Sequence, residues 1–157
     1  LEHAQKLHML SGERVVFVEL NLRRVLGDLA FVGIVDLLLQ DKNNPNHFYL
    51  IDHKTAARRY DETKIVTDQQ LTAYQWLMRE SGYLPAEAEL SLCWDVLLKQ
   101  KTPMVERYTT IRSKQSEQSF LAVTKTILRA IEQEIFYPNP SWLCRDCGYR
   151  HLCDAWI

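Results

Sequence analysis

The sequence is short of the features that mark several classes of protein. Glycine and proline each occur only five times in 157 residues, and no segment is repeated or of low complexity. No apolar run reaches the roughly 20 residues that a membrane-spanning helix needs, so we expect no membrane partner. The formal net charge of −1 shows no excess of either sign, and any basic surface must therefore be local.

Cysteine is also scarce, with four residues in the chain. Three of them lie close to the end of the chain, and Cys93 stands alone. This clustering favours metal binding in a reducing compartment over a disulfide framework. We therefore expect a cytoplasmic protein. The chain opens at Leu1 with no initiator methionine, and we expect a domain truncated at its N-terminus from a longer protein.

The rest of the composition is that of a globular domain, with 46% hydrophobic and 25% charged residues. Runs of β-branched and aromatic residues predict strands over 14–22, 31–40, 47–54, 89–98 and 104–111. A helix is predicted from a cap at Thr67 or Asp68 to about Glu80. A longer amphipathic helix is predicted from Ser113 or Ser116 to about Ile135. The order β-β-β-α-β-β-α predicts an α/β domain with a mixed central sheet flanked by helices.

Three further segments complete the expected organisation. The long helix is expected to turn one apolar stripe inward, formed by Phe120, Val123, Ile127, Ala130 and Ile131. Residues 56–67 show no clear period and predict a basic surface loop. Residues 1–10 carry leucine and alanine on one stripe and predict the tail of a helix.

Two acids and a lysine follow apolar runs that neighbouring strands would bring together. Asp52 and Lys54 are two residues apart and leave the same face of a strand. Asp36 ends the preceding run, so pairing of the two runs would place two carboxylates and one ammonium at one spot. Close carboxylates repel unless a positive charge lies between them, and Mg²⁺ prefers oxygen ligands. We therefore expect a magnesium site; the alternative is a surface ion pair between Asp52 and Lys54.

Further polar residues are placed to line such a site. Gln70 and Tyr74 are four residues apart on one helical face, which suits contact with phosphate. A half-buried tyrosine beside a solvated glutamine is the alternative interpretation. Arg58 and Arg59 directly follow the strand that carries Asp52, where the phosphates of a nucleic acid would pass.

The closing segment carries the pattern C-x2-C-x5-C at Cys144, Cys147 and Cys153. Thiolates this close together on a turning chain can reach one metal. Cys93 lies in a predicted core strand and is interpreted as a buried thiol. The cysteines therefore lack a fourth ligand. His151 would complete a zinc site, and an empty triad is a further alternative.

Three short motifs occur in a characteristic order: GIVD at 33–36, IDHKT at 51–55 and QLTAY at 70–74. These motifs match the pattern GxxD, D-x-K-T and Q-x3-Y. In this pattern the sequence resembles nuclease domains of the RecB type, which belong to the PD-(D/E)XK superfamily. The closing cysteine motif is similar too, so the resemblance covers nearly the whole chain. It implies a restriction-endonuclease-like core over 1–141 with a Cys-rich segment over 142–157 packed on it.

The resemblance implies a metal-binding role for several matching residues. Asp36 and Asp52 would bind Mg²⁺ or Mn²⁺, and the backbone carbonyl of His53 would be a further ligand. Lys54 would assist the attacking water. Glu19 stands where these domains often carry a glutamate on the first strand.

The resemblance also implies a DNA path and an iron–sulfur cluster. Gln70 and Tyr74 would line the site and the DNA path. In related nucleases the three cysteines join one near the N-terminus on a 4Fe–4S cluster that ties the chain ends together. The family also has a metal-binding histidine upstream, which we expect to precede Leu1, because His3 and His8 are interpreted as helix-surface residues.

We therefore expect a metal-dependent DNA nuclease, in the first place an exonuclease, that hydrolyses phosphodiester bonds by a metal-activated water. Such domains accompany helicases or recombination and repair proteins, or belong to phages and prokaryotic CRISPR adaptation systems. The alternative is a catalytically incomplete DNA-binding or assembly module of the same fold, which the missing histidine favours. A zinc-binding structural domain with an incidental acid pair is a third hypothesis.

Overall fold

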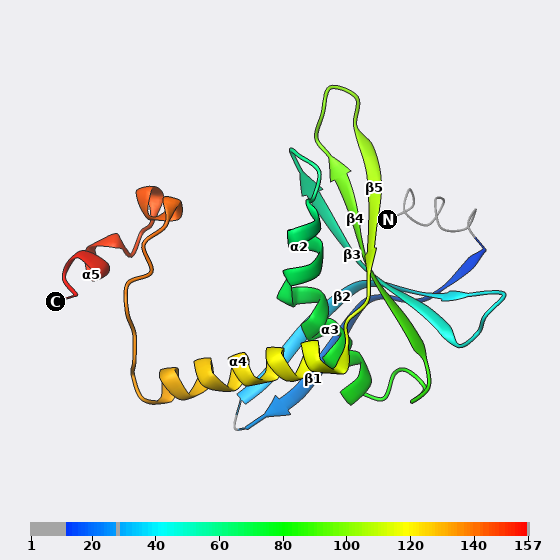
Figure 1. The fold of residues 1–157 in the computed structure, drawn as a ribbon, viewed down its shortest axis with the longest axis horizontal. Coiled ribbons are helices and arrows are strands. Elements are labelled where there is room, and N and C mark those ends of the chain that lie inside the picture. Colours follow the sequence, from blue (N-terminus) through cyan, green and yellow to red (C-terminus); the bar gives the residue numbers. More distant parts are fainter. Residues whose placement is uncertain (1–11, 28, 157) are drawn as a thin grey trace. The chain divides into compact units, whose positions relative to one another are not determined.

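Within the described residues a five-stranded sheet forms the centre of the fold (Figure 1). Its strands are β1 (Glu13–Leu26), β2 (Leu29–Asp41), β3 (His47–Ala56), β4 (Glu89–Leu98) and β5 (Met104–Thr110), side by side in sequence order. β3 and β4 run parallel, and every other neighbouring pair is antiparallel. The predicted mixed α/β architecture and the order of its main elements are therefore confirmed.

The computed structural model describes residues 12–27 and 29–156. The chain divides into two units, Leu1–Phe120 and Leu121–Ile157. The predicted helix tail over 1–10, with His3 and His8, lies outside the described residues. In the described ranges, no helix combines the length and the apolar character that crossing a membrane requires.

The strand β4 lies in the middle of the core. Leu92, Cys93 and Trp94 are consecutive, and all three are fully buried. Burial of successive residues is typical of a strand that is covered on both faces. Burial also raises the pKa of the Cys93 thiol, so this cysteine is the buried thiol that the sequence predicted.

Two helices connect β3 to β4, namely α2 (Glu62–Thr67) and α3 (Gln69–Glu80). The Asp68 side chain caps α3 by accepting a hydrogen bond from the Gln70 backbone N–H at 2.8 Å, as the sequence predicted. The short helix α2 corrects the expected loop over 56–67. It has no buried residue, so it leaves no apolar period in the sequence, and its start depends on a local cap at Asp61.

The helix α4 (Lys114–Glu132) corrects a second expectation. Phe120 is buried, with its ring centroid 5.8 Å from that of Phe31. Three of the residues expected to face inward are instead exposed, namely Val123 (59%), Ile127 (54%) and Ile131 (49%). Amphipathic spacing shows that a helix has an apolar face but does not show what covers it. Beyond Phe120 the helix belongs to the second unit.

Arg112 follows β5 and ties the helical connection to the sheet. Its Nη2 donates to the carbonyls of Ile65 (2.8 Å) and Asp68 (3.2 Å). Its Nε donates to Thr72 Oγ1 (3.0 Å) and its Nη1 to Thr110 Oγ1 (2.7 Å). The rigid fork of the guanidinium supplies these donors in one plane. The end of α2 and the beginning of α3 are therefore held in place by one side chain.

We expect Arg112→Met to lower the free energy of unfolding by about 2–3 kcal/mol, because buried acceptors lose their donor. Urea denaturation of the purified variant measures this change. Arg129→Met replaces an exposed arginine of α4 and should change stability by no more than about 0.5 kcal/mol. Equal stability of the two variants would contradict the role given to Arg112.

Candidate active site

Two strands separate at the centre of the site. β2 and β3 are paired as far as Leu37 and Ile51, and continuing this register would place Asp36 opposite Asp52. Instead, Asp36 Oδ2 accepts a hydrogen bond from the His53 backbone N–H at 2.7 Å. The Asp36 carboxylate thus accepts a hydrogen bond that a backbone carbonyl of β2 would accept in a regular sheet. This bond holds Asp36 next to the strand that carries Asp52.

Asp52 is the buried charge of the site, with 2% of its surface exposed. Lys54 Nζ lies 2.7 Å from Asp52 Oδ2. Despite this short ion pair, Oδ2 accepts no hydrogen bond of regular geometry within the described chain. Burial raises the pKa of Asp52, and the lysine offsets this effect only in part. The charge of the buried carboxylate is therefore compensated only in part by Lys54.

The pKa of Lys54 reflects the same two effects, burial and the ion pair, in a different balance. Burial by itself would lower the pKa of Lys54, but the short ion pair with Asp52 outweighs this effect, so this pKa is raised. The side chain therefore remains an ammonium at neutral pH. It can donate hydrogen bonds and neutralise negative charge, but it does not accept a proton.

Gln70 and Tyr74 lie on α3 and contact one another, as their spacing predicted. Gln70 Nε2 donates to the Tyr74 hydroxyl oxygen at 3.0 Å. Burial raises the pKa of Tyr74, and the nearby Asp52 and Asp36 raise it further. The phenol therefore keeps its proton, and its O–H is left to donate to a ligand.

Gly33, the glycine of the GxxD motif, lies where a side chain would meet the helix α3. A Cβ at this position would lie 2.7 Å from Leu77 Cδ1 and 3.1 Å from Tyr74 Cε1. Both side chains belong to α3, so the helix approaches β2 more closely than any other residue would permit. This approach places Tyr74 beside the carboxylates.

The remaining predicted residues of the site lie around this centre. Glu19 lies opposite Asp36, between the pairs Val18–Leu37 and Leu20–Val35. Its φ of 50° is in the left-handed region that glutamate rarely adopts. The ring of His53 approaches Asp36, with 3.8 Å between Nδ1 and Oδ2.

The loop that follows β3 carries the two predicted DNA-binding arginines. Arg58 is exposed, whereas Arg59 Nη2 forms an ion pair with Glu106 Oε1 at 2.6 Å. Glu106 and Tyr108, two residues apart on β5, were not among the predicted site residues. Alternation along β5 places these two side chains on one face, and that was the available signal.

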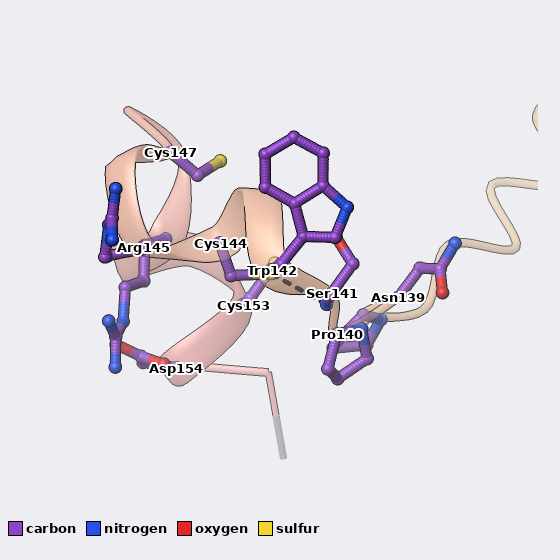
Figure 2. A pocket seen from close by; sticks show the side chains of 11 residues that line it. Asn139, Pro140, Ser141, Trp142, Cys144, Arg145, Cys147, Cys153 and Asp154 are labelled. Atoms are coloured by element: carbon purple, nitrogen blue, oxygen red, sulfur yellow. Dashed lines mark hydrogen bonds and ion pairs between the residues drawn. The ribbon is translucent and has the colours of Figure 1, made fainter. Parts of the chain in front are cut away.

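The three C-terminal cysteines line one hollow of about 660 Å³ in the second unit, between the 3-10 helix η1 (Trp142–Asp146) and the helix α5 (Arg150–Asp154) (Figure 2). The Ser141 backbone N–H donates to Cys144 Sγ at 3.2 Å. Cys147 and Cys153 are exposed. Across the described ranges, no three His, Cys, Asp or Glu side chains are grouped so that they could hold a metal ion. The triad therefore shares a hollow without forming a three-ligand site in this structure.

Comparison with known proteins places the chain in a family. The model of the PD-(D/E)XK nuclease superfamily matches residues 1–154. A candidate exonuclease from Eubacterium rectale aligns with a TM-score of 0.50 and 12% identity, over 90% of this chain and 52% of its own. The protein SSO0001 aligns with a TM-score of 0.52 and 17% identity, over 99% of this chain and 68% of its own.

These structural likenesses concern the fold alone, because the identities are low. This chain spans about half the length of the Eubacterium rectale protein. No curated protein matches the sequence.

We expect Gly33→Ala to displace Leu77 and Tyr74, and to lower the free energy of unfolding by about 1–3 kcal/mol through overpacking. Urea denaturation measures the loss. Gly148→Ala is the matched control, because no atom lies within 4 Å of the added Cβ. A Gly33→Ala variant as stable as Gly148→Ala would show that α3 does not need this close approach.

The raised pKa of Asp52 makes stability depend on pH in a defined direction. A carboxyl whose pKa is higher in the native than in the unfolded chain binds protons preferentially in the native state. In EDTA, the parent should gain stability relative to Asp52→Asn as the pH falls through the native pKa toward the ordinary aspartate value of about 3.9.

Asp41 provides a control of opposite sign, since backbone hydrogen bonds from Asn43 and Asn44 lower its pKa. The parent should lose stability relative to Asp41→Asn as the pH falls below about 3.9. Urea denaturation at several pH values measures both differences. A fall in the stability of the parent relative to Asp52→Asn between the native pKa of Asp52 and about pH 3.9 would contradict the raised pKa of this buried carboxyl.

Proposed function

The chain belongs to the PD-(D/E)XK nuclease superfamily, and from this membership and the geometry of the site we propose that it is a metal-dependent deoxyribonuclease of the RecB type, acting as an exonuclease. The observation that carries the proposal is the buried Asp52 carboxylate, paired with Lys54 and adjacent to Asp36 where two strands separate. Burying a carboxylate whose charge is only partly compensated costs free energy, and a bound cation would offset this cost.

The donor set fits a hard divalent cation. Asp52 Oδ2 is buried without a regular hydrogen bond, and the Asp36 carboxylate is anchored through one oxygen by the His53 N–H. Mg²⁺ and Mn²⁺ prefer such oxygen ligands. We propose the His53 backbone carbonyl as a third ligand and Glu19 as a further one. A divalent ion bound there lowers the pKa of a coordinated water.

The residues around the ion have separate tasks in the proposed reaction. The oxygen of a water molecule would form a bond to phosphorus while the bond from phosphorus to one deoxyribose oxygen breaks. The attacking water would lose a proton to solvent, and the leaving oxygen would take up a proton from solvent and depart as an alcohol. Lys54, held as an ammonium, orients the water and stabilises negative charge on the phosphate. The O–H of Tyr74, oriented by Gln70, donates to a phosphate oxygen. Arg58 and Arg59 attract the backbone of the DNA.

We also propose that Cys144, Cys147 and Cys153 are ligands of a 4Fe–4S cluster, with a fourth ligand that the sequence does not identify, or of a zinc ion completed by His151. Their common position around one hollow supports this proposal. Iron and zinc analysis of freshly purified protein distinguishes the cluster, the zinc ion and an empty triad.

A second candidate is a catalytically incomplete DNA-binding or assembly module that serves a helicase or a recombination protein. One observation favours it: in the described part of the chain, no three metal-binding side chains come together. The two functions differ in whether DNA is cut when magnesium or manganese is supplied.

The test is degradation of end-labelled single-stranded and duplex DNA with Mg²⁺ or Mn²⁺. We expect the parent to cut, EDTA to stop the reaction, and Asp52→Asn and Lys54→Met each to lower the rate at least about 100-fold. Asp41→Asn removes a carboxylate outside the site and should cut like the parent. Cutting by Asp52→Asn at the parent rate would refute the proposed site, and binding without cutting by the parent would favour the second candidate.

A further inference from the structure

An aromatic cluster fixes the chain immediately after β3. The registers of the three strands place Asp52, Trp94 and Tyr108 in one row across β3, β4 and β5. The ring of Tyr60 stacks on Tyr108 with 5.6 Å between centroids, and meets the edge of Trp94 at 6.0 Å. Tyr60 is therefore anchored to the sheet next to the row that contains Asp52. Its sequence neighbour, Arg59, is held at a defined place as a result.

The next row of the same face contains Lys54, Val96 and Glu106. Glu106 is thus two strands away from Lys54, which corresponds to about 10 Å. Arg59 reaches over this row, and its Nη2 and Nε lie 2.6 and 2.8 Å from Glu106 Oε1. The Tyr108 hydroxyl donates to the other carboxylate oxygen at 2.6 Å. The Glu106 carboxylate therefore binds two nitrogens of Arg59 close to the candidate active site.

The pair has the chemistry of an exchangeable anion site. The fork of a guanidinium suits a carboxylate and a phosphate equally well. Arg59 is 64% exposed and Glu106 21%. Because the guanidinium is open to solvent and such ion pairs contribute little to stability, a competing anion can displace Glu106. The hydrogen bond from Tyr108, with help from Arg59, lowers the pKa of Glu106. Glu106 is therefore an anion at neutral pH.

We propose that Arg59 binds a substrate phosphate adjacent to the one that is cut, and that Glu106 occupies Arg59 until that phosphate replaces it. This inference rests on the proposed nuclease function. A separation of about 10 Å from Lys54 places the exchange site within reach of the same nucleic-acid strand. Glu106 then acts as an internal competitor. It presets the position of Arg59 and weakens the binding of any nucleic acid that does not displace it.

The experiment measures binding of a fluorescently labelled single-stranded oligodeoxynucleotide by anisotropy, in EDTA and at several salt concentrations. Glu106→Gln should tighten binding up to about fivefold. Arg59→Gln should weaken binding by a similar factor and reduce the slope of log K against log salt by about 0.7, the value of one phosphate contact on a single strand. In the double variant, Glu106→Gln should produce no further change.

The double variant separates this mechanism from a general effect of charge. The proposal is overturned if Glu106→Gln tightens binding by the same factor in the Arg59→Gln background as in the parent. It is also overturned if Glu106→Gln alone does not tighten binding. Tyr108→Phe, which removes the support of Glu106, should tighten binding less than Glu106→Gln does. Glu62→Gln removes an exposed negative charge from the neighbouring helix α2 and should leave affinity within about twofold.

The outcomes also separate this inference from the proposed function. A parent that cuts DNA but whose affinity does not respond to Glu106→Gln overturns the exchange alone. A chain that neither binds nor cuts DNA overturns both the exchange and the nuclease function.

Discussion

The burial of one carboxylate, that of Asp52, is the constraint on which the rest of the site depends. An ionised group that is 2% exposed requires compensating charge and hydrogen bonds. Lys54 supplies part of this compensation from two residues along the same strand. The incompletely compensated carboxylate, together with the nearby Asp36, forms an environment that suits a divalent cation.

The fold keeps these groups together through contacts outside the site itself. β3 is paired with β2 as far as Ile51 and with the buried β4 from His47 to Ala56, so the backbone of Asp52 is held by its pairing with Trp94. Gly33 permits the close approach of α3, and Arg112 holds the turn that precedes this helix. Tyr74 therefore lies near the carboxylates, and Gln70 donates a hydrogen bond to its hydroxyl oxygen.

Much of the fold followed from local patterns in the sequence. Alternating apolar residues and turn formers predicted the five strands, and a cap at Thr67 or Asp68 predicted the beginning of α3. The GxxD, D-x-K-T and Q-x3-Y motifs predicted which side chains the site would contain. Contacts between distant residues could not be predicted in this way. The hydrogen bonds of Arg112, the pairing of Arg59 with Glu106 and the exposure of Val123 on α4 depend on packing in three dimensions, and the helix α2 has no apolar stripe to reveal it.

The central claim is that Asp36 and Asp52 together hold a divalent metal ion, and direct titration of the protein with Mn²⁺ tests it. Electron paramagnetic resonance detects free Mn²⁺, so the loss of this signal counts the bound ions. The account predicts that the parent binds at least one ion per chain, and that Asp36→Asn and Asp52→Asn each weaken this binding strongly. Mn²⁺ binding by Asp52→Asn that equals that of the parent would contradict the account.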